Sequence, residues 1–181
     1  VTENHHVHAY ETQNLTRLHT ITPPVSSIET VLVDSFHQII YVPDEGGGSG
    51  VGPGVHAYDT NGLPYERNGT NVFGASGIFQ ADEEGITLHR CMTEGEDNGR
   101  GFIIVSDQKG DISDFEFFDR ETWMYLGTLR INGVSNTDGI ATTEVSRPMY
   151  PRGIFAAVDN DATTALVGWQ EIYEATNLTC N

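Results

Sequence analysis

The stretch Ala81-Asp82-Glu83-Glu84-Gly85-Ile86-Thr87-Leu88 opens the segment of the chain that decides its fold. Three further apolar or alternating runs follow it, at 101–108, 114–119 and 123–131, and polar turns separate all four runs. Short runs of this composition are typical of β-strands. The opening pattern then returns at Asp138-Gly139-Ile140. A four-stranded unit that restarts in this way predicts an antiparallel sheet used as the blade of a propeller.

The period of the repeat follows from the acidic residues that open each inner strand. Glu29, Glu84 and Asp138 lie at intervals of 55 and 54 residues. They predict an all-β chain with three four-stranded, antiparallel, propeller-like blades, in repeats over about 29–83, 84–137 and 138–181. The third repeat shows fewer strands than the others, so we expect the hairpin at 7–21 to close it. Propellers need four or more blades, so the whole chain, 1–181, reads as one segment of a larger propeller-like architecture.

A short internal duplication supports the repeat. Val7-His8-Ala9-Tyr10-Glu11-Thr12 returns almost unchanged as Val55-His56-Ala57-Tyr58-Asp59-Thr60, and the run at 114–119 occupies the equivalent place in a third copy. Between these copies, the continuous apolar runs at 28–34 and 38–45 predict a central hairpin that is buried on both faces.

The charge of the chain is strongly one-sided. Nine Lys and Arg residues face 26 Asp and Glu residues, which gives a formal net charge of -17. A polyanionic surface argues against nucleic acid and anionic membranes as partners, because both need clustered cations. No apolar run is long enough to span a bilayer. The acidic surface suits hard cations such as Ca²⁺, which bind carboxylate and carbonyl oxygens, although solubility alone also explains it.

Cysteines and glycosylation signals indicate the compartment. The two cysteines, Cys91 and Cys180, predict a disulfide that ties the C-terminus to a blade loop. Three sequons begin at Asn14, Asn68 and Asn177, all in expected turns or near the terminus. An even cysteine count together with three sequons in a chain of 181 residues favours secretion of a glycosylated protein.

Several short sequence motifs in the second half of the chain resemble those of the β-propeller phytases, which are secreted, calcium-dependent phosphatases with a six-bladed fold. They are Ala81-Asp82-Glu83-Glu84-Gly85-Ile86, the run at 101–108, Asn136-Thr137-Asp138-Gly139-Ile140 and the run at 150–159. The run at 38–45 is similar to an earlier blade of that family. The resemblance spans about 30–172 and covers only about the last half of the family's domain.

The resemblance implies a calcium site. Carried over residue by residue, the family's calcium-binding oxygens fall on Asp82, Glu84, Gln108, Asp138 and one of Asp44 or Glu45. Carboxylates at the ends of the innermost blade strands converge on a central channel, where they would raise one another's pKa without a cation. In the family, calcium also holds the substrate phosphate and a nucleophilic water. The alternative is that Glu84-Gly85 and Asp138-Gly139 serve only as turns.

The chain departs from the family at the basic residues that grip phosphate. Only two basic residues, Lys109 and Arg152, lie near the motifs that resemble the family, and the sequence contains no cluster of basic residues. Phosphoryl transfer depends on positioned positive charge, so no catalytic residue is assigned. The sequence therefore predicts a secreted, calcium-binding, phytase-like β-propeller glycoprotein that is non-catalytic alone and serves a structural or self-assembly role, filament formation included.

Two other hypotheses stay open. One is a binding module that keeps the calcium scaffold without catalysis. The other is a calcium-dependent phosphomonoesterase, a phytase acting on a phosphate ester, that is completed by blades from another chain. The expected partner of the chain is a second copy or a propeller-completing chain. Three blades alone would leave aromatic side chains without neighbours, such as Phe117, Phe118, Trp123 and Tyr125.

Overall fold

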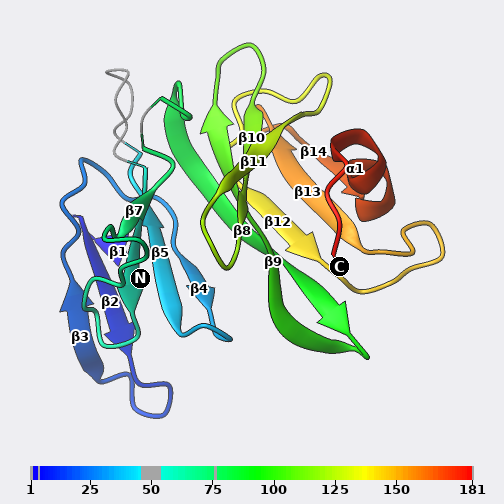
Figure 1. Cartoon of the computed structure of the whole chain (residues 1–181). Helices are drawn as coiled ribbons and strands as arrows, with labels where there is room; N and C mark the ends of the chain where they lie inside the picture. Colours follow the sequence, from blue (N-terminus) through cyan, green and yellow to red (C-terminus); the bar gives the residue numbers. More distant parts are fainter. Residues whose placement is uncertain (1, 4, 46–53, 76, 181) are drawn as a thin grey trace. The chain divides into compact units, whose positions relative to one another are not determined.

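The computed structural model describes residues 2–3, 5–45, 54–75 and 77–180. The chain divides into two compact units, Val1–Glu83 and Glu84–Asn181, and each is described by itself. Both are built from antiparallel β-sheets, which Figure 1 shows as separate groups of arrows. The described residues form an all-β fold apart from one short helix, and the sequence predicts the all-β class. No helix of the described residues is long and apolar enough to cross a membrane.

The first unit contains two sheets. A three-stranded sheet has the order β1-β2-β3, with β1 (Thr2–Glu3), β2 (His6–Tyr10) and β3 (Arg17–Ile21). A four-stranded sheet has the order β4-β5-β6-β7, with β4 (Leu32–Asp34), β5 (Ile39–Pro43), β6 (Val55–Asp59) and β7 (Val72–Phe73). The second sheet is the four-stranded blade expected for the first repeat.

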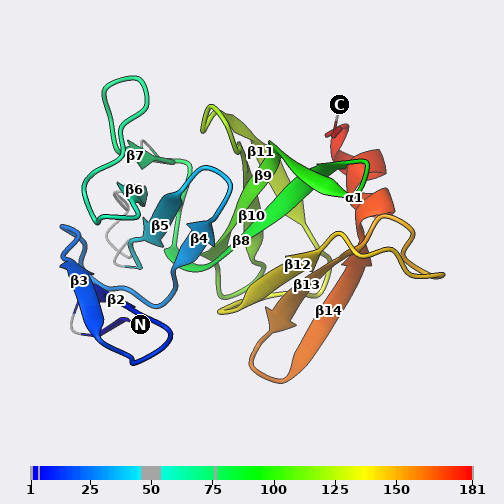
Figure 2. The same ribbon diagram turned by 90° about the horizontal axis from the view of Figure 1, so that it is seen from below.

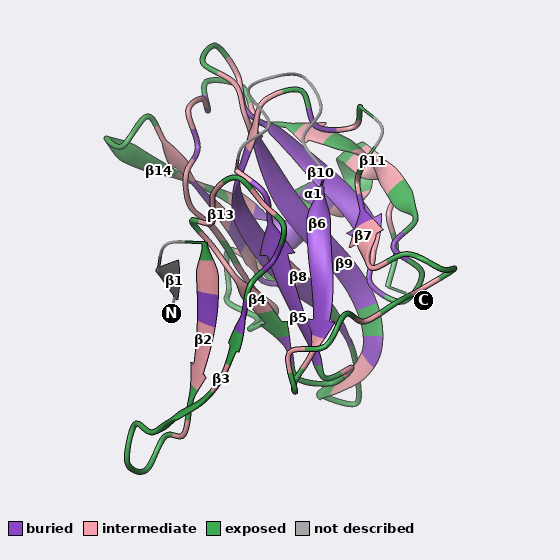
Figure 3. Ribbon diagram, turned by 90° about the vertical axis from the view of Figure 1, so that its left-hand side faces the viewer, coloured by how far each residue is buried: buried purple, intermediate pink, exposed green. Residues whose placement is uncertain are grey.

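The core of the first unit joins its two sheets. Val7 and Ile21 from β2 and β3 pack with Ile40, Val42 and Tyr58 from β5 and β6. Figure 3 shows β5 and β6 as mostly buried, as their continuous apolar sequence predicts. The expected strand over 28–34 is shorter than predicted, because only Leu32–Asp34 pairs with β5. The hairpin at 7–21 forms within the β1-β2-β3 sheet, and its closure of the third repeat stays a prediction.

The second unit also contains two sheets. The four-stranded sheet has the order β8-β9-β10-β11 along its chain, with β8 (Asp82–Thr93), β9 (Glu96–Gln108), β10 (Asp114–Asp119) and β11 (Tyr125–Arg130). The expected four runs therefore form one blade. The three-stranded sheet has the order β12-β13-β14, with β12 (Ile140–Thr143), β13 (Ile154–Asp159) and β14 (Thr163–Gly168), which lie side by side in Figure 2.

A short helix, which the repeat pattern of the sequence does not predict, follows the last strand. Helix α1 (Trp169–Thr176) follows β14 directly and contacts β14 and β11. Its apolar residues Trp169, Ile172 and Tyr173 recur at the three- and four-residue spacing of a helix face, and Trp169 and Ile172 are buried. Asn177 ends the helix in the left-handed conformation, φ 58°, in which its N–H bonds to the Tyr173 carbonyl.

Aromatic side chains fill the core of the second unit. Phe102 and Phe117 from the four-stranded sheet pack with Phe155 from the three-stranded sheet and with Trp169 and Ile172 from α1. Phe117 therefore has its neighbours within its own unit, contrary to the expectation that it needs a partner chain. Phe118 packs against Tyr125 at 5.6 Å between ring centroids, and Trp123 is buried.

Replacement of Trp169 by alanine should destabilise the second unit strongly. The indole is fully buried, and its loss leaves a large cavity between the two sheets, which for Trp→Ala costs about 3–5 kcal/mol of unfolding free energy. Denaturant unfolding of the chain measures this cost. The matched control is Leu166→Ala on the neighbouring strand, where the side chain is exposed and the expected cost is below about 1 kcal/mol. Equal costs for the two variants would contradict the assigned core.

Candidate calcium site and its surroundings

The start of β8 lies against the segment that leads into β12. Gly85 donates its N–H to Ser106 Oγ at 2.7 Å, which fixes the start of β8 to β9. A Cβ at Gly85 would lie 3.0 Å from the Asp138 carbonyl oxygen and 3.1 Å from the Ile140 nitrogen. A Cβ so close would require the neighbouring backbone to shift by a few tenths of an ångström. The backbone at Gly85 therefore lies against the backbone from Asp138 to Ile140.

Gln108 joins the same place from the end of β9. Its side-chain amide donates a hydrogen bond from Nε2 to Asp138 Oδ1. Backbone hydrogen bonds hold both residues, since Asn136 N donates to the Lys109 carbonyl at 3.2 Å and Val158 N donates to the Gly139 carbonyl at 2.9 Å. The structure thus brings Gln108 and Asp138 together, with Glu84 on the adjoining strand.

The other candidate ligands lie in the first unit. Asp44 is buried, and its Oδ1 accepts hydrogen bonds from the Ser26 amide at 2.9 Å, the Ser26 hydroxyl at 2.8 Å and the Ser27 amide at 3.4 Å. This oxygen holds a turn. Glu45 follows β5 and donates its N–H to the Ser27 carbonyl at 3.3 Å. Asp82 is the first residue of β8 and is half-buried.

A buried group of three carboxylates stands beside the candidate site and is absent from the sequence-based prediction. Oxygens of Asp107, Asp114 and Glu116 lie within 4.8 Å of one another. The β-ladder explains the cluster: Asp114 of β10 pairs with Asp107 of β9, and Glu116 lies two residues farther along the same face of β10. The alternation Asp114-Phe115-Glu116 within a predicted hairpin was the signal from which this cluster was predictable.

Two cations neutralise this cluster. Lys109 Nζ lies 2.6 Å from Asp114 Oδ2 and 3.2 Å from Asp107 Oδ2, and Arg130 binds both oxygens of Asp114 from Nε and Nη2 at 2.5 and 2.8 Å. The bidentate hydrogen bonds from Arg130 are the main reason that the pKa of Asp114 is lowered. Burial disfavours the charged Lys109, but its two carboxylate partners outweigh burial and raise its pKa.

Glu116 is held differently. Its Oε2 accepts hydrogen bonds from the Tyr125 hydroxyl at 2.8 Å and the Thr128 hydroxyl at 2.7 Å. Burial raises the pKa of Glu116, these two hydrogen bonds oppose the rise, and the negative charges of Asp107 and Asp114 add to it. Buried carboxylates without a cation of their own favour the protonated form, which is the case for Glu116.

The predicted disulfide is present. Cys91 and Cys180 are bonded, with their Cα atoms 5.3 Å apart and 89 residues between them in sequence. Cys91 lies within β8, not in a loop, so the bond ties the segment after α1 to the inner strand of the blade. The acceptor asparagines of the three sequons, Asn14, Asn68 and Asn177, are all exposed.

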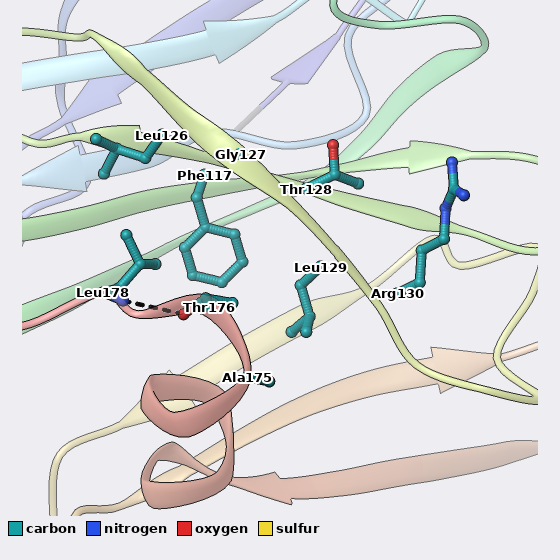
Figure 4. A pocket seen from close by; sticks show the side chains of 9 residues that line it. All are labelled: Phe117, Leu126, Gly127, Thr128, Leu129, Arg130, Ala175, Thr176 and Leu178. Carbon is teal, nitrogen blue, oxygen red and sulfur yellow. Dashed lines mark hydrogen bonds between the residues drawn. The ribbon is translucent and has the colours of Figure 1, made fainter.

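A pocket of about 400 Å³ lies at the β11 edge of the β8–β11 sheet. Figure 4 shows it between β11 and the end of α1, where Phe117, Leu126 and Leu129 face Ala175 and Leu178. Its walls mix apolar side chains with Thr128, Arg130 and Thr176, and none of the candidate calcium ligands lines it. Arg130 lies at its rim, but its guanidinium is already engaged by Asp114. The pocket therefore does not extend the acidic site.

The substitution Glu116→Gln should stabilise the chain more at pH 7 than at pH 4. Because the folded-state pKa of Glu116 is raised, its contribution to stability is fully present below the unfolded pKa and is lost as pH rises through the folded pKa. Glutamine stays neutral and still accepts hydrogen bonds. Thermal unfolding of variant and wild type at both pH values measures the difference. Glu96→Gln, an exposed carboxyl on β9, is the control, and an equal pH response of the two variants would contradict the assignment.

A family model described as Phytase matches residues 54–171, which is more than half of the chain. No curated protein matches the sequence. The match includes Asp82, Glu84, Gln108 and Asp138, whereas Asp44 and Glu45 precede it. Together with the propeller-like four-stranded sheets, this match shows that the chain belongs to the Phytase family.

Proposed function

We propose that this phytase-like β-propeller chain binds calcium, is secreted and glycosylated, and serves a structural or self-assembly role without catalysis of its own. The observation that carries the calcium site is the contact between Gln108 and Asp138 beside the start of β8. The side chains of Gln108 and Asp138, 30 residues apart in sequence, are joined by a hydrogen bond, and the backbone at Gly85 lies against that of Asp138. Turn formation alone does not require this side-chain chemistry.

The donor set fits Ca²⁺. Calcium takes six to eight oxygens from carboxylates, amide carbonyls and water. With Nε2 of Gln108 donating to Asp138, the amide oxygen Oε1 is the atom that remains for a cation. Asp138 supplies a carboxylate, and Asp82, Glu84 and one of Asp44 or Glu45 stay ligands expected from the family resemblance. When bound, the ion supplies positive charge that offsets the crowding of these acids.

The cations beside the site support a non-catalytic role. Lys109, the basic residue next to Gln108, is bound by Asp107 and Asp114, and Arg130 is bound by Asp114. Phosphoryl transfer needs positive charge aimed at the phosphate oxygens. A group that already pairs with buried carboxylates would have to abandon them to serve there, which leaves buried charge uncompensated.

Family membership favours a second candidate function. A calcium-dependent phosphomonoesterase would result if blades from another chain supplied the missing cations to the same calcium site. The substrate would be a phosphate ester such as phytate. This candidate differs from the first only in the partner, because the contribution of the present chain, oxygens for calcium, is the same in both.

The disulfide and the sequons support secretion. Disulfides persist in oxidising compartments and are rare in the cytosol, and the Cys91–Cys180 bond is formed. Asn14, Asn68 and Asn177 are exposed, so a glycan attached to any of them would meet no steric obstacle from buried backbone.

Self-association is proposed from the strand count of the sheets. The β12-β13-β14 sheet has three strands, whereas the β4–β7 and β8–β11 sheets have four. A strand from residues 7–12 of the same chain or of a second copy would complete it, provided that β2 leaves its pairing with β1 and β3. When such an exchange runs head to tail without closing, it produces a filament.

Calcium should raise the thermal unfolding midpoint. At free calcium about 100 times its Kd, the gain of about 2.7 kcal/mol corresponds to a midpoint about 5–10 °C higher than in EDTA for a chain of this size. Asp138→Asn should remove most of the shift because it removes a ligand charge. The matched control is Asp111→Asn, an exposed acid in the turn before β10. Equal midpoints with calcium and EDTA, and no heat of calcium binding, would refute the site.

The purified chain should release little or no phosphate from phytate, with or without calcium, and should associate with itself. A molybdate assay measures phosphate, and light scattering over a range of concentrations measures mass. Rapid calcium-dependent phosphate release by the chain alone would refute the non-catalytic role and favour the enzyme. A single species of 19.8 kDa at the highest concentration would refute self-association.

A further inference from the structure

The second unit contains a cleft that the calcium-site proposal does not use. It has a volume of about 300 Å³. The residues on which the argument depends are His89, Arg90, Glu144, Arg152, Tyr173 and Cys180, all of which line it. His89 lies five residues after Glu84 on β8, which corresponds to about 17 Å along a strand. The cleft is therefore separate from the candidate calcium ligands on the same strand.

Close backbone packing positions the segment that carries Arg152. Gly153 has φ +95°, and a Cβ there would lie 1.9 Å from the Thr143 carbonyl oxygen, so only glycine fits. Gly153 N donates to the Tyr150 carbonyl at 3.1 Å, and Trp169 N donates to the Gly153 carbonyl at 3.1 Å. These contacts hold the backbone beside Arg152 against the start of α1, while the Arg152 side chain itself is exposed.

Arg90 is held with part of its guanidinium unused. It donates from Nη2 to Glu144 Oε2 at 2.7 Å and from Nε to Glu144 Oε1 at 3.3 Å, while its backbone N donates to Glu144 Oε1 at 2.7 Å. These hydrogen bonds lower the pKa of Glu144 although burial opposes them. A guanidinium has five N–H donors, so the donors on Nη1 of Arg90 remain for another acceptor.

Arg152 supplies the charge that no carboxylate balances. Its guanidinium carbon lies 5.4 Å from the centre of the Tyr173 ring. Within the part of the chain that the structure describes, no carboxylate oxygen lies within 4 Å of its nitrogens. In a chain with a net charge of -17, a cation that lines a cleft and has no acidic neighbour remains available to an external anion.

The floor of the cleft is rigid and neutral. His89 is buried, its ring stacks on Trp169 at 3.5 Å between centroids, and its Nε2 lies 2.7 Å from the Tyr173 hydroxyl. Burial lowers the pKa of His89 to about 4, so the ring is neutral at pH 7. The charges that line the cleft are then those of Arg90, Glu144 and Arg152, and their sum is positive.

We propose that this cleft binds a small tetrahedral oxyanion of the phosphate or sulfate type. Arg152 supplies its planar set of N–H donors, which matches two oxygens of such an anion. Arg90 supplies the donors left on Nη1, and Glu144 keeps Arg90 in place. The site uses none of the calcium ligands, so it goes beyond the proposed function and stands or falls independently of it.

Titration calorimetry of the full chain with inorganic phosphate, and separately with sulfate, tests the proposal. EDTA in all solutions removes the calcium site as a cause of binding, and ionic strength of about 0.15 M shortens the reach of the distant acids to about 8 Å. The wild-type chain should bind at least one of the two anions saturably. Arg152→Gln should lower the affinity about tenfold or more.

Arg147→Gln is the matched control. Arg147 lies in the same loop and is exposed, and its side chain donates only to the neighbouring Ser146 carbonyl, at 3.4 Å. Its affinity for the anion should stay within about twofold of the wild type. Wild-type chain that binds neither anion, or equal losses in the two variants, would overturn the proposal, because general charge attraction would then suffice.

Acetate serves as a third ligand. It carries a single charge on a planar group, so a site built for a tetrahedral dianion should bind it at least about tenfold more weakly than the better of the two dianions. Equal affinity for acetate would contradict the tetrahedral class. In parallel, NMR of the arginine side-chain Nε–H signals should show the Arg152 signal moving with phosphate or sulfate while the Arg147 signal stays. Movement of neither, or of both, would overturn the assignment to Arg152.

Discussion

The second unit depends on the packing of one indole ring. Trp169 stacks on His89 of β8 at 3.5 Å and lies 6.2 Å from Phe102 of β9 and 6.5 Å from Phe155 of β13, between ring centroids. Its Nε1 donates to Thr142 Oγ1 on β12 at 2.6 Å. Both sheets of the unit thus bury their aromatic faces against the same side chain. A large aromatic ring with one polar atom suits this place because apolar area and a hydrogen bond are satisfied together.

The chemistry at the far end of β8 follows from this packing. Since His89 lies under Trp169, it is buried and neutral at pH 7, and the adjoining Arg90 turns outward to Glu144. The disulfide from Cys91 then carries the chain end to the same place, where the Tyr173 hydroxyl lies 3.3 Å from Cys180 Sγ. Successive side chains of β8 point to opposite faces, so the buried His89 ring and the Arg90–Glu144 ion pair lie on different sides of the strand.

Scarce cations shape the rest of the unit. Lys109 and Arg130 neutralise the buried acids of the blade, and the fully buried Arg120 donates to both oxygens of Asp97 at 2.7 and 3.0 Å. Buried charges are stable only when they are paired and hydrogen-bonded. The chain has nine basic residues against 26 acids, and it uses several of these cations to neutralise its own buried acids. Few cations are therefore available to bind an external phosphate, and Arg152 is one of them.

The all-β class, the four strands from β8 to β11, the family resemblance and the disulfide are all predictable from the sequence. Alternation, the 54–55-residue period and the count of two cysteines are local or arithmetic signals. The sequence also singled out Gln108 and Asp138, which the structure joins by a hydrogen bond. The tertiary structure alone decided which acids are already neutralised. Asp107 and Asp114 face each other only through the register of the β9–β10 ladder, which no linear pattern states. It also decided the end of the chain, where Trp169 begins a helix, because the helix face becomes apolar core only when both sheets are present to cover it.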